Sequence, residues 1–262
     1  MHFAYIGAAI IPAILILLYA YKQDTFPEPP RIVFKTFLFG CATVLGIDLL
    51  IPVLDNFSKE NFTGQTFHFF NNFIRAAFVE EFFKLSVIIF YCTRKTAFDE
   101  PMDGLIYGVA ASLGFAAYEN IDYVLYFYKE PSFDIALVRA FSAVPMHALC
   151  GIMMGFLVSQ SIFEKEHNYL NLVLALLIPV GMHGLYNFSY SSQLISPQVA
   201  NIILFVFTIR AIFMFKKLKR KQQTGIIFNK KHYTITTNNF INATTTVLLI
   251  YLSLNYIVNI FL

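Results

Sequence analysis

Long apolar segments separated by short polar connections run along the whole chain. Eight of them are long enough for a transmembrane helix, which needs about 20 apolar residues. They cover approximately residues 3–21, 32–54, 67–91, 104–128, 136–160, 169–190, 197–215 and 244–262. No alternation of period two over segments of about ten residues is present, so the pattern does not indicate a membrane β-barrel. The pattern predicts an all-α fold, a polytopic integral membrane helical bundle of about eight transmembrane helices.

The composition agrees with a membrane protein. Hydrophobic residues make up 57% of the 262 residues and charged residues only 13%, against about 25% charged residues in a typical soluble domain. These proportions exclude a soluble enzyme and a disordered scaffold. A net charge of +3 is too small to indicate a nucleic-acid partner. The three cysteines have no C-x-x-C spacing and are expected to be small buried residues.

The lysines and arginines divide unevenly between the two sets of connections. One set holds thirteen of them, among them the run from Lys216 to Lys221, and the other set holds Lys59, Lys129 and Arg139. The positive-inside rule places the first set in the cytoplasm. We therefore expect a multi-pass protein of the cell membrane, the inner membrane of a bacterium, with both ends of the chain outside. The basic run is expected to anchor its helix, and a contact with anionic lipid is a second reading.

Polar and charged residues lie inside four of the expected spans. They are Glu80, Glu81 and Lys84 in the third, Glu119, Asn120 and Asp122 in the fourth, His147 in the fifth, and His183 and Asn187 in the sixth. A charged residue at the centre of a membrane helix costs roughly 2.5–3.5 kcal/mol, so the third span alone would cost on the order of 8–10 kcal/mol. Such groups are kept when they pair inside the bundle or serve a function.

The expected depths of these groups agree. At about 1.5 Å per residue, Glu80 lies roughly 20 Å, His147 roughly 16 Å, Glu119 roughly 13 Å and His183 roughly 10 Å below the outer ends of their helices. All four fall in one layer, from the centre of the membrane to its outer half. Lys84 lies one helical turn from the glutamate pair and can neutralise one carboxylate.

Glycines on the same helices favour close contact. Gly151 and Gly155 share a helix face with His147, and Gly104 and Gly108 have the same spacing in the fourth span. Small residues at this spacing let two helices approach closely in lipid.

One carboxylate and two imidazoles are sufficient to hold a catalytic zinc ion, which takes three protein ligands and leaves a position for water. We expect Glu119, His147 and His183 as metal ligands for Zn²⁺, and Glu80 or Glu81 as the base. Asn120 and Asn187 are candidates for steadying an oxyanion. The alternative for each histidine is a hydrogen bond between helices, and the alternative for the glutamates and Lys84 is a structural ion cluster.

The sequence lacks the motifs of three other kinds of membrane protease. The sequence has neither H-E-x-x-H nor G-x-S-x-G nor Gly-x-Gly-Asp. These absences argue against a helical zincin site, a serine nucleophile and an aspartyl dyad.

The motifs resemble those of the PrsW family of intramembrane proteases, which we group with CAAX prenyl proteases and bacteriocin-immunity proteins. Glu80-Glu81-Phe82-Phe83-Lys84 matches E-E-x-x-K, and Phe115 to Asn120 matches F-x-x-x-E-N. His147 to Gly151 matches H-x-x-x-G, and a final histidine follows at His183. The segments 24–29 and 99–104 also look like the family, and the resemblance covers roughly residues 3–215.

The resemblance implies hydrolysis of a peptide bond in a membrane-anchored protein, such as an anti-sigma factor, with the glutamates and histidines essential. It implies a protease domain over 1–215 with its motif-bearing helices within 67–190. A basic cytoplasmic linker, 216–243, and an additional transmembrane helix, 244–262, are expected to follow. The alternatives are an ion- or proton-coupled transporter and a non-catalytic scaffold or immunity protein. Transporters often show internal repeats, and none is evident here.

Overall fold

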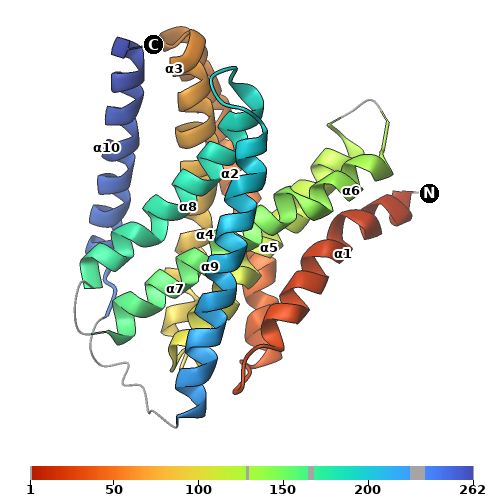
Figure 1. Cartoon of the computed structure of the whole chain (residues 1–262), viewed down its shortest axis with the longest axis vertical. Helices are drawn as coiled ribbons and strands as arrows, with labels where there is room; N and C mark the ends of the chain where they lie inside the picture. Colours follow the sequence, from red (N-terminus) through yellow and green to blue (C-terminus); the bar gives the residue numbers. More distant parts are fainter. Residues whose placement is uncertain (1, 128–129, 165–167, 225–233, 262) are drawn as a thin grey trace.

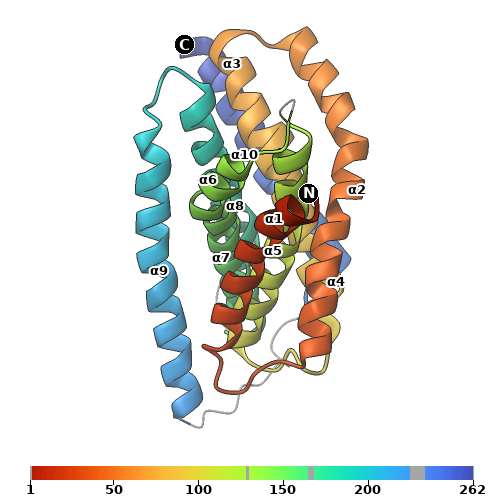
Figure 2. The same cartoon turned by 90° about the vertical axis from the view of Figure 1, so that its right-hand side faces the viewer.

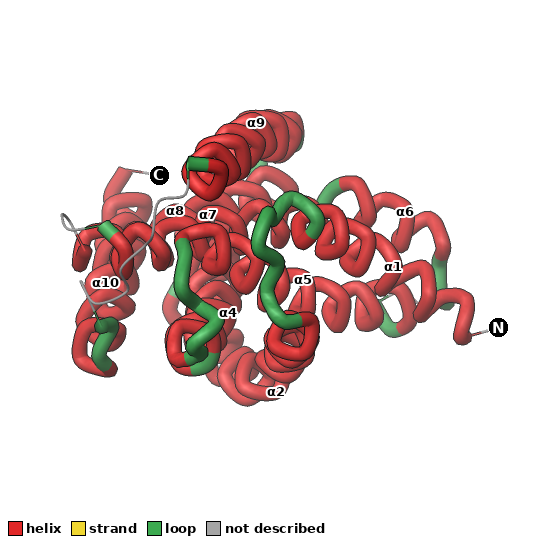
Figure 3. The backbone as a smooth tube through the Cα atoms, turned by 90° about the horizontal axis from the view of Figure 1, so that it is seen from below, coloured by secondary structure: helices red, strands yellow, loops and turns green. Residues whose placement is uncertain are grey.

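The structure is a computed structural model that describes residues 2–127, 130–164, 168–224 and 234–261. Its elements are α1 (His2–Tyr21), α2 (Pro30–Asn61), α3 (Gly64–Phe69), the π-helix η1 (Phe70–Phe78), α4 (Val79–Phe90), the 3-10 turn η2 (Cys92–Arg94), α5 (Pro101–Leu125), α6 (Phe133–Phe141), α7 (Ala143–Phe163), α8 (Asn168–Ser191), α9 (Gln198–Gln223) and α10 (Thr237–Phe261). The described residues contain helices and loops and no strand (Figures 1 and 3).

The predicted all-helical membrane bundle is confirmed. Six helices in the described part are long and apolar enough to cross a membrane: α1, α2, α6 with α7, α8, α9 and α10. The two other long helical stretches are α3 through α4 and α5, and they carry most of the charged residues that the sequence places inside spans. Since every backbone group of a span must be satisfied in lipid, continuous helices are the expected solution.

The centre of the bundle is the crossing of α5 and α7. A Cβ atom added at Gly108 would lie 2.1 Å from the carbonyl oxygen of Gly151, and one added at Gly155 would lie 1.8 Å from that of Gly104. Only glycine leaves room for backbones this close, as the spacing of these four residues predicts. The two helices therefore form a rigid pair, and His147 projects from one of them.

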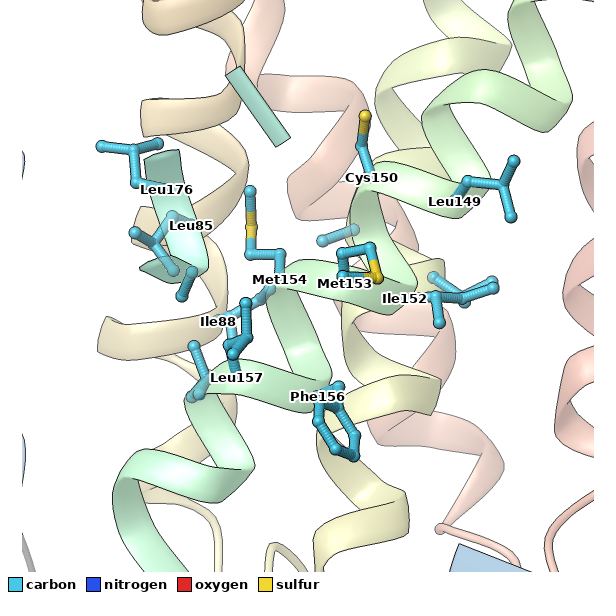
Figure 4. Close-up of a cluster of buried hydrophobic side chains, with 14 of the residues drawn as sticks. Leu85, Ile88, Leu149, Cys150, Ile152, Met153, Met154, Phe156, Leu157 and Leu176 are labelled. Atoms are coloured by element: carbon cyan, nitrogen blue, oxygen red, sulfur yellow. The ribbon is translucent and has the colours of Figure 1, made fainter. Parts of the chain in front are cut away.

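An apolar core lies next to the polar residues, further along α4 and α7, and holds α7 against its neighbours. Figure 4 shows Leu85 and Ile88 of α4, Met154 and Leu157 of α7, and Leu176 of α8 in this core. Since lipid is as apolar as these side chains, the contacts stabilise the bundle mainly through close packing.

The outer helices face the membrane. α2 and α9 flank the bundle in Figure 2, and α10 lies at its edge in Figure 3. Only 17–22% of the residues in the most apolar windows of these three helices are buried. The corresponding share for the α6–α7 stretch is 83%. The exposed leucines and phenylalanines of the outer helices are those that lipid would cover.

Three local features differ from the expected spans. The third span contains η1, a nine-residue π-helix. The fifth, expected as one helix over 136–160, is broken at Ser142 (φ −127°, ψ −78°) into α6 and α7. The first part of the expected linker 216–243 is helical, because α9 continues to Gln223, and α10 begins at Thr237 rather than at 244. Residues 225–233 of that linker lie outside the described residues.

Candidate active site

Polar side chains from α4, α7 and α8 lie together inside the bundle. Glu80, Glu81, His147 and His183 each offer a metal-ligating atom, and these four atoms lie within 4.8 Å of one another. All four residues are buried. With Lys84, Glu119 and Arg139 they form what we call the outer polar cluster.

A cleft of about 800 Å³ gives access to this cluster. Glu80, Glu119, His147, His183 and Asn187 line it. Its other end is lined by Asn71, Asp134 and Ser191, near helix ends that the charge distribution places outside the cytoplasm. The cleft therefore leads from the buried ionisable groups to the end of the bundle that the charge distribution predicts to lie outside the cytoplasm.

The π-helix sets the direction of the glutamates. η1 ends at Phe78, directly before α4, and Glu80 and Glu81 lie in the first turn of α4. A π-helix changes the angular register of the residues that follow it, and such segments are frequent at functional sites. Glu80 lines the cleft with 12% of its side chain exposed, whereas the side chain of Glu81 has no exposed surface.

Lys84 joins α4 to α7. Its ammonium donates to Oε1 of Glu81 over 2.8 Å and lies 3.1 Å from Nδ1 of His147. Because an ammonium has only donors, Nδ1 of His147 must accept and Nε2 must carry the proton. That N–H donates to Oε2 of Glu119 over 3.1 Å. The network thus fixes both the tautomer and the orientation of His147.

His183 is held from the opposite side. Its Nδ1 lies 2.9 Å from Oε1 of Glu81, a carboxylate that already accepts from Lys84, so Nδ1–H is the donor. Its Nε2 faces Oε2 of Glu80 at 3.8 Å. The rings of His147 and His183 meet edge to face, with centroids 5.1 Å apart.

Arg139 is a site residue that the sequence analysis did not identify. Its guanidinium is ion-paired with Glu119. It also donates from Nε to Oδ1 of Asn120 over 2.6 Å and lies over the ring of Tyr123 at 3.8 Å. From the sequence it counts only as a charge in the less basic set of connections. Its place inside the expected apolar span 136–160 was the available signal.

The candidate residues divide into two groups. Glu80, Glu119, His147, His183 and Asn187 face the cleft. Glu81, Lys84 and Asn120 lie behind its wall, with exposures of 0% for each residue. Asn120 donates to the backbone carbonyl of Ala9 and accepts from Arg139. Its amide is thus used in holding α1 and Arg139, which corrects the expectation that it steadies an oxyanion.

The donor set fits a metal ion, with a different composition from the expected one. Oε2 of Glu80 and Oε2 of Glu81 are buried and have no hydrogen-bond partner. Carboxylates and an imidazole are ligands that zinc accepts, and His183 has a ring nitrogen available, whereas both nitrogens of His147 already have partners. Glu119, expected as a ligand, lies outside the group of four and is engaged by Arg139 and His147.

A second group of buried carboxylates lies at the opposite end of the bundle. Asp24, Glu28, Glu100 and Asp103, which we call the cytoplasmic acidic cluster, are each less than 9% exposed. Gln222 of α9 donates to Oδ1 of Asp24 over 2.6 Å and to Glu100, and Tyr107 donates to Glu28. Burial raises the pKa of Glu100 to about 7, and the neighbouring carboxylate of Asp24 adds to the rise. These bonds connect the end of α9 to the α1–α2 loop and to the start of α5.

Comparisons with known proteins agree with the motifs. Residues 28–213 match the family model described as PrsW family intramembrane metalloprotease. The chain is 37% identical to Protease PrsW of Bacillus subtilis over 188 residues, 71% of this chain and 82% of the relative. It is 34% identical to Protease PrsW of Oceanobacillus iheyensis over 183 residues, 70% of this chain and 81% of the relative. For Protease PrsW of Clostridioides difficile the identity is 31% over 204 residues, 77% of this chain and 84% of the relative. No solved structure matches the chain.

These matches support some of the statements that the resemblance implied and leave others without support. The grouping with CAAX prenyl proteases and bacteriocin-immunity proteins gains no support from them and is withdrawn. The alternatives of a transporter and a scaffold gain none either. The matched residues include α2 through most of α9, and with them every residue of the outer polar cluster. The family model covers more than half of the chain, and the chain belongs to the PrsW family of intramembrane proteases.

Proposed function

We propose that the chain hydrolyses a peptide bond of a membrane-anchored protein in the cleft, with Glu80 as the base. The observation that carries this proposal is the asymmetry of the glutamate pair. Each glutamate keeps one buried oxygen without a hydrogen-bond partner, but Glu80 lines the cleft, whereas Glu81 is enclosed between Lys84 and His183. Only Glu80 is placed to meet a water molecule that enters from outside.

The proton transfers follow from these positions. Glu80 accepts a proton from water while the water oxygen forms a bond to the scissile carbonyl carbon. The proton then passes to the amide nitrogen as the carbon–nitrogen bond breaks. Asn187, which also lines the cleft, is our candidate donor to the negatively charged carbonyl oxygen. Glu81 and Lys84 hold the two histidines, and Arg139 holds Glu119.

We also propose a metal ion, zinc being the one that suits these ligands. Glu81 and His183 would hold it, because both ring nitrogens of His147 are used by Lys84 and Glu119 and Glu80 is kept as the base. Bound there, it would supply Lewis acidity that polarises the carbonyl and acidifies water. Glu119 leaves the expected ligand set in this proposal, because Arg139 and His147 occupy its oxygen Oε2.

The position of the cleft supports a substrate cut near its extracytoplasmic side. The cleft ends beside Asp134 and Ser191, where α6 begins and α8 ends. A single-pass protein could place the residues next to its membrane anchor there without crossing the apolar core. An anti-sigma factor has this topology, and we propose this class of substrate in a bacterial inner membrane.

Expression in Bacillus subtilis lacking its own Protease PrsW tests the function. Single-pass anti-sigma factors of that bacterium, tagged at both ends, serve as probes. Wild-type protein should produce a shortened fragment of at least one probe. Glu80→Gln should produce none while reaching the membrane in equal amount. Cleavage by Glu80→Gln at the wild-type rate, or no cleavage of any probe by wild-type protein, would contradict the proposal.

A further inference from the structure

A second hollow opens on the lipid-facing side of the bundle, between α1, α7 and α9. It has a volume of about 270 Å³. Its walls are mainly apolar and include Ile16 of α1, Ala148 and Ile152 of α7, and Ile212 of α9. None of the residues that line it belongs to the outer polar cluster. We call it the α1–α9 groove.

Polar groups gather at one end of the groove. They are Tyr19 in the last turn of α1, Gln23 just after α1, and Lys216 and Lys219 on α9. The two lysines are three residues apart, so they lie on the same face of the helix. The sequence places this end at the cytoplasmic surface, because it belongs to the basic set of connections.

The basic run at the end of α9 is divided between two faces. Lys216 and Lys219 line the groove, whereas Lys217 and Arg220 do not. Lys217 lies over the ring of Phe156 at 6.0 Å. Successive helical residues point about 100° apart, so within this run only Lys216 and Lys219 face the groove, and the two faces can be tested separately.

The length of the groove matches one lipid leaflet. Along α9 it extends from Thr208 to Lys219, which is about 16 Å at a rise of 1.5 Å per residue. Half of a hydrocarbon core of about 30 Å is roughly 15 Å. An acyl chain lying in the groove would therefore reach from the middle of the bilayer to the headgroup level, where the two ammonium groups are.

We propose that the α1–α9 groove binds one anionic phospholipid of the cytoplasmic leaflet. Its phosphate pairs with Lys216 and Lys219, and an acyl chain lies along Leu149 and Ile152. Basic pockets between helices on the cytoplasmic side are suited to such headgroups. The lipid would pack against α7, the helix that carries His147, on the side away from the cleft. This proposal does not depend on the proteolytic activity.

Native mass spectrometry of the full chain with phosphatidylglycerol and phosphatidylcholine tests it. Wild-type protein should retain one phosphatidylglycerol in preference to phosphatidylcholine. The double variant Lys216→Gln/Lys219→Gln should bind phosphatidylglycerol roughly 30-fold more weakly, the ratio expected for about 1 kcal/mol per lysine. The control Lys217→Gln/Arg220→Gln removes the same charge from the other face and should bind within about threefold of wild type. Equal weakening by both double variants would overturn the proposal.

A second variant tests the apolar part of the groove. Ala211→Phe places a ring between α9 and α7 and leaves both lysines intact, so it should also lose the retained phosphatidylglycerol. Retention as in wild type would contradict an acyl chain in the groove. If this variant does not fold, a photoreactive residue at Ile212 of the otherwise wild-type chain replaces it in native membranes. Cross-linking to phospholipid supports the proposal, and cross-linking to a polypeptide assigns the groove to a protein partner and overturns it.

Discussion

The outer polar cluster and the cytoplasmic acidic cluster both bury several carboxylates, and they neutralise them differently. In the outer polar cluster the carboxylates lie beside Lys84, Arg139 and two histidines. In the cytoplasmic acidic cluster the hydrogen bonds to carboxylates come from Gln222, Tyr107 and backbone N–H groups, and no ion pair of the described residues reaches it. Buried charges are costly unless they are paired. The first cluster is therefore built to keep charge, and the second is built to hold elements together with shared hydrogen bonds.

This difference predicts opposite effects of a Glu→Gln substitution in the two clusters. In the outer polar cluster a Glu→Gln change removes a charge that other charged groups need. In the cytoplasmic acidic cluster the same change at Glu100 removes a charge that has no ion-pair partner among the described residues. The following predictions test that contrast.

The largest effect is expected from the glutamate pair. Glu80→Gln should lower the rate of cleavage by about 10²–10⁴, the usual contribution of a general base, with little change in stability. Glu81→Gln should abolish cleavage and also destabilise the protein by about 3–5 kcal/mol, because buried Lys84 loses its closest carboxylate. Cleavage assays and thermal unfolding of both variants measure the two effects. Equal losses of stability would show that the cleft-lining carboxylate of Glu80 and the enclosed carboxylate of Glu81 do not differ in role.

The second largest effect is expected from substitutions of Arg139. Arg139→Gln should reduce cleavage about 10- to 100-fold, because Glu119 then loses the partner that orients it toward His147. Arg139→Lys should recover part of the activity, since an ammonium can pair with Glu119 but cannot also make the forked contact with Asn120. The readout is kcat against KM, with Arg94→Gln at the other end of the bundle as the control. A purely structural role would give no recovery by lysine.

The α5–α7 crossing supports the outer polar cluster from below. Gly155→Ala should destabilise the bundle by about 1–3 kcal/mol, because its Cβ would collide with the backbone of Gly104 and the two helices would have to separate. Gly7→Ala is the matched control, since the nearest atom to its Cβ would be a side-chain carbon 3.9 Å away. Thermal unfolding measures both. Similar melting temperatures for the two variants would mean that the crossing can relax.

The smallest effect concerns Glu100. Its pKa in the folded protein is raised from 4.5 to about 7, so folding favours its protonated form. The contribution of Glu100 to stability is then full below about pH 4.5 and is lost as the pH rises through about 7. Glu100→Gln stays neutral and keeps an oxygen that can accept from Gln222, so its melting temperature should fall less between pH 5 and 8. We expect it to exceed the wild type by a few degrees at pH 8, with cleavage unchanged. A steeper fall than in wild type would refute the interpretation.

The sequence indicated which residues form the candidate site, but it did not indicate the local backbone geometry around them. The motif residues could be identified because a charged or imidazole side chain in an apolar span is rare, whatever the fold around it. The structure brings together residues of four helices that the depth argument expects in one layer, since helices have a fixed rise. The break at Ser142 and the π-helix before Glu80 were not predicted, because neither depends on a composition that differs from ordinary helix.

The sequence by itself determined that this chain is a helical membrane bundle, and its motifs identified the PrsW family. These properties follow from residue type and spacing, because lipid admits few backbone structures and helical periodicity is fixed. Only the tertiary structure decided that Glu80 faces the cleft while Glu81 is enclosed, and that Arg139 forms an ion pair with Glu119. Two adjacent residues such as Glu80 and Glu81 acquire different surroundings only when the helices pack. The packing depends on contacts between different helices, and the spacing of residues along the sequence does not specify those contacts.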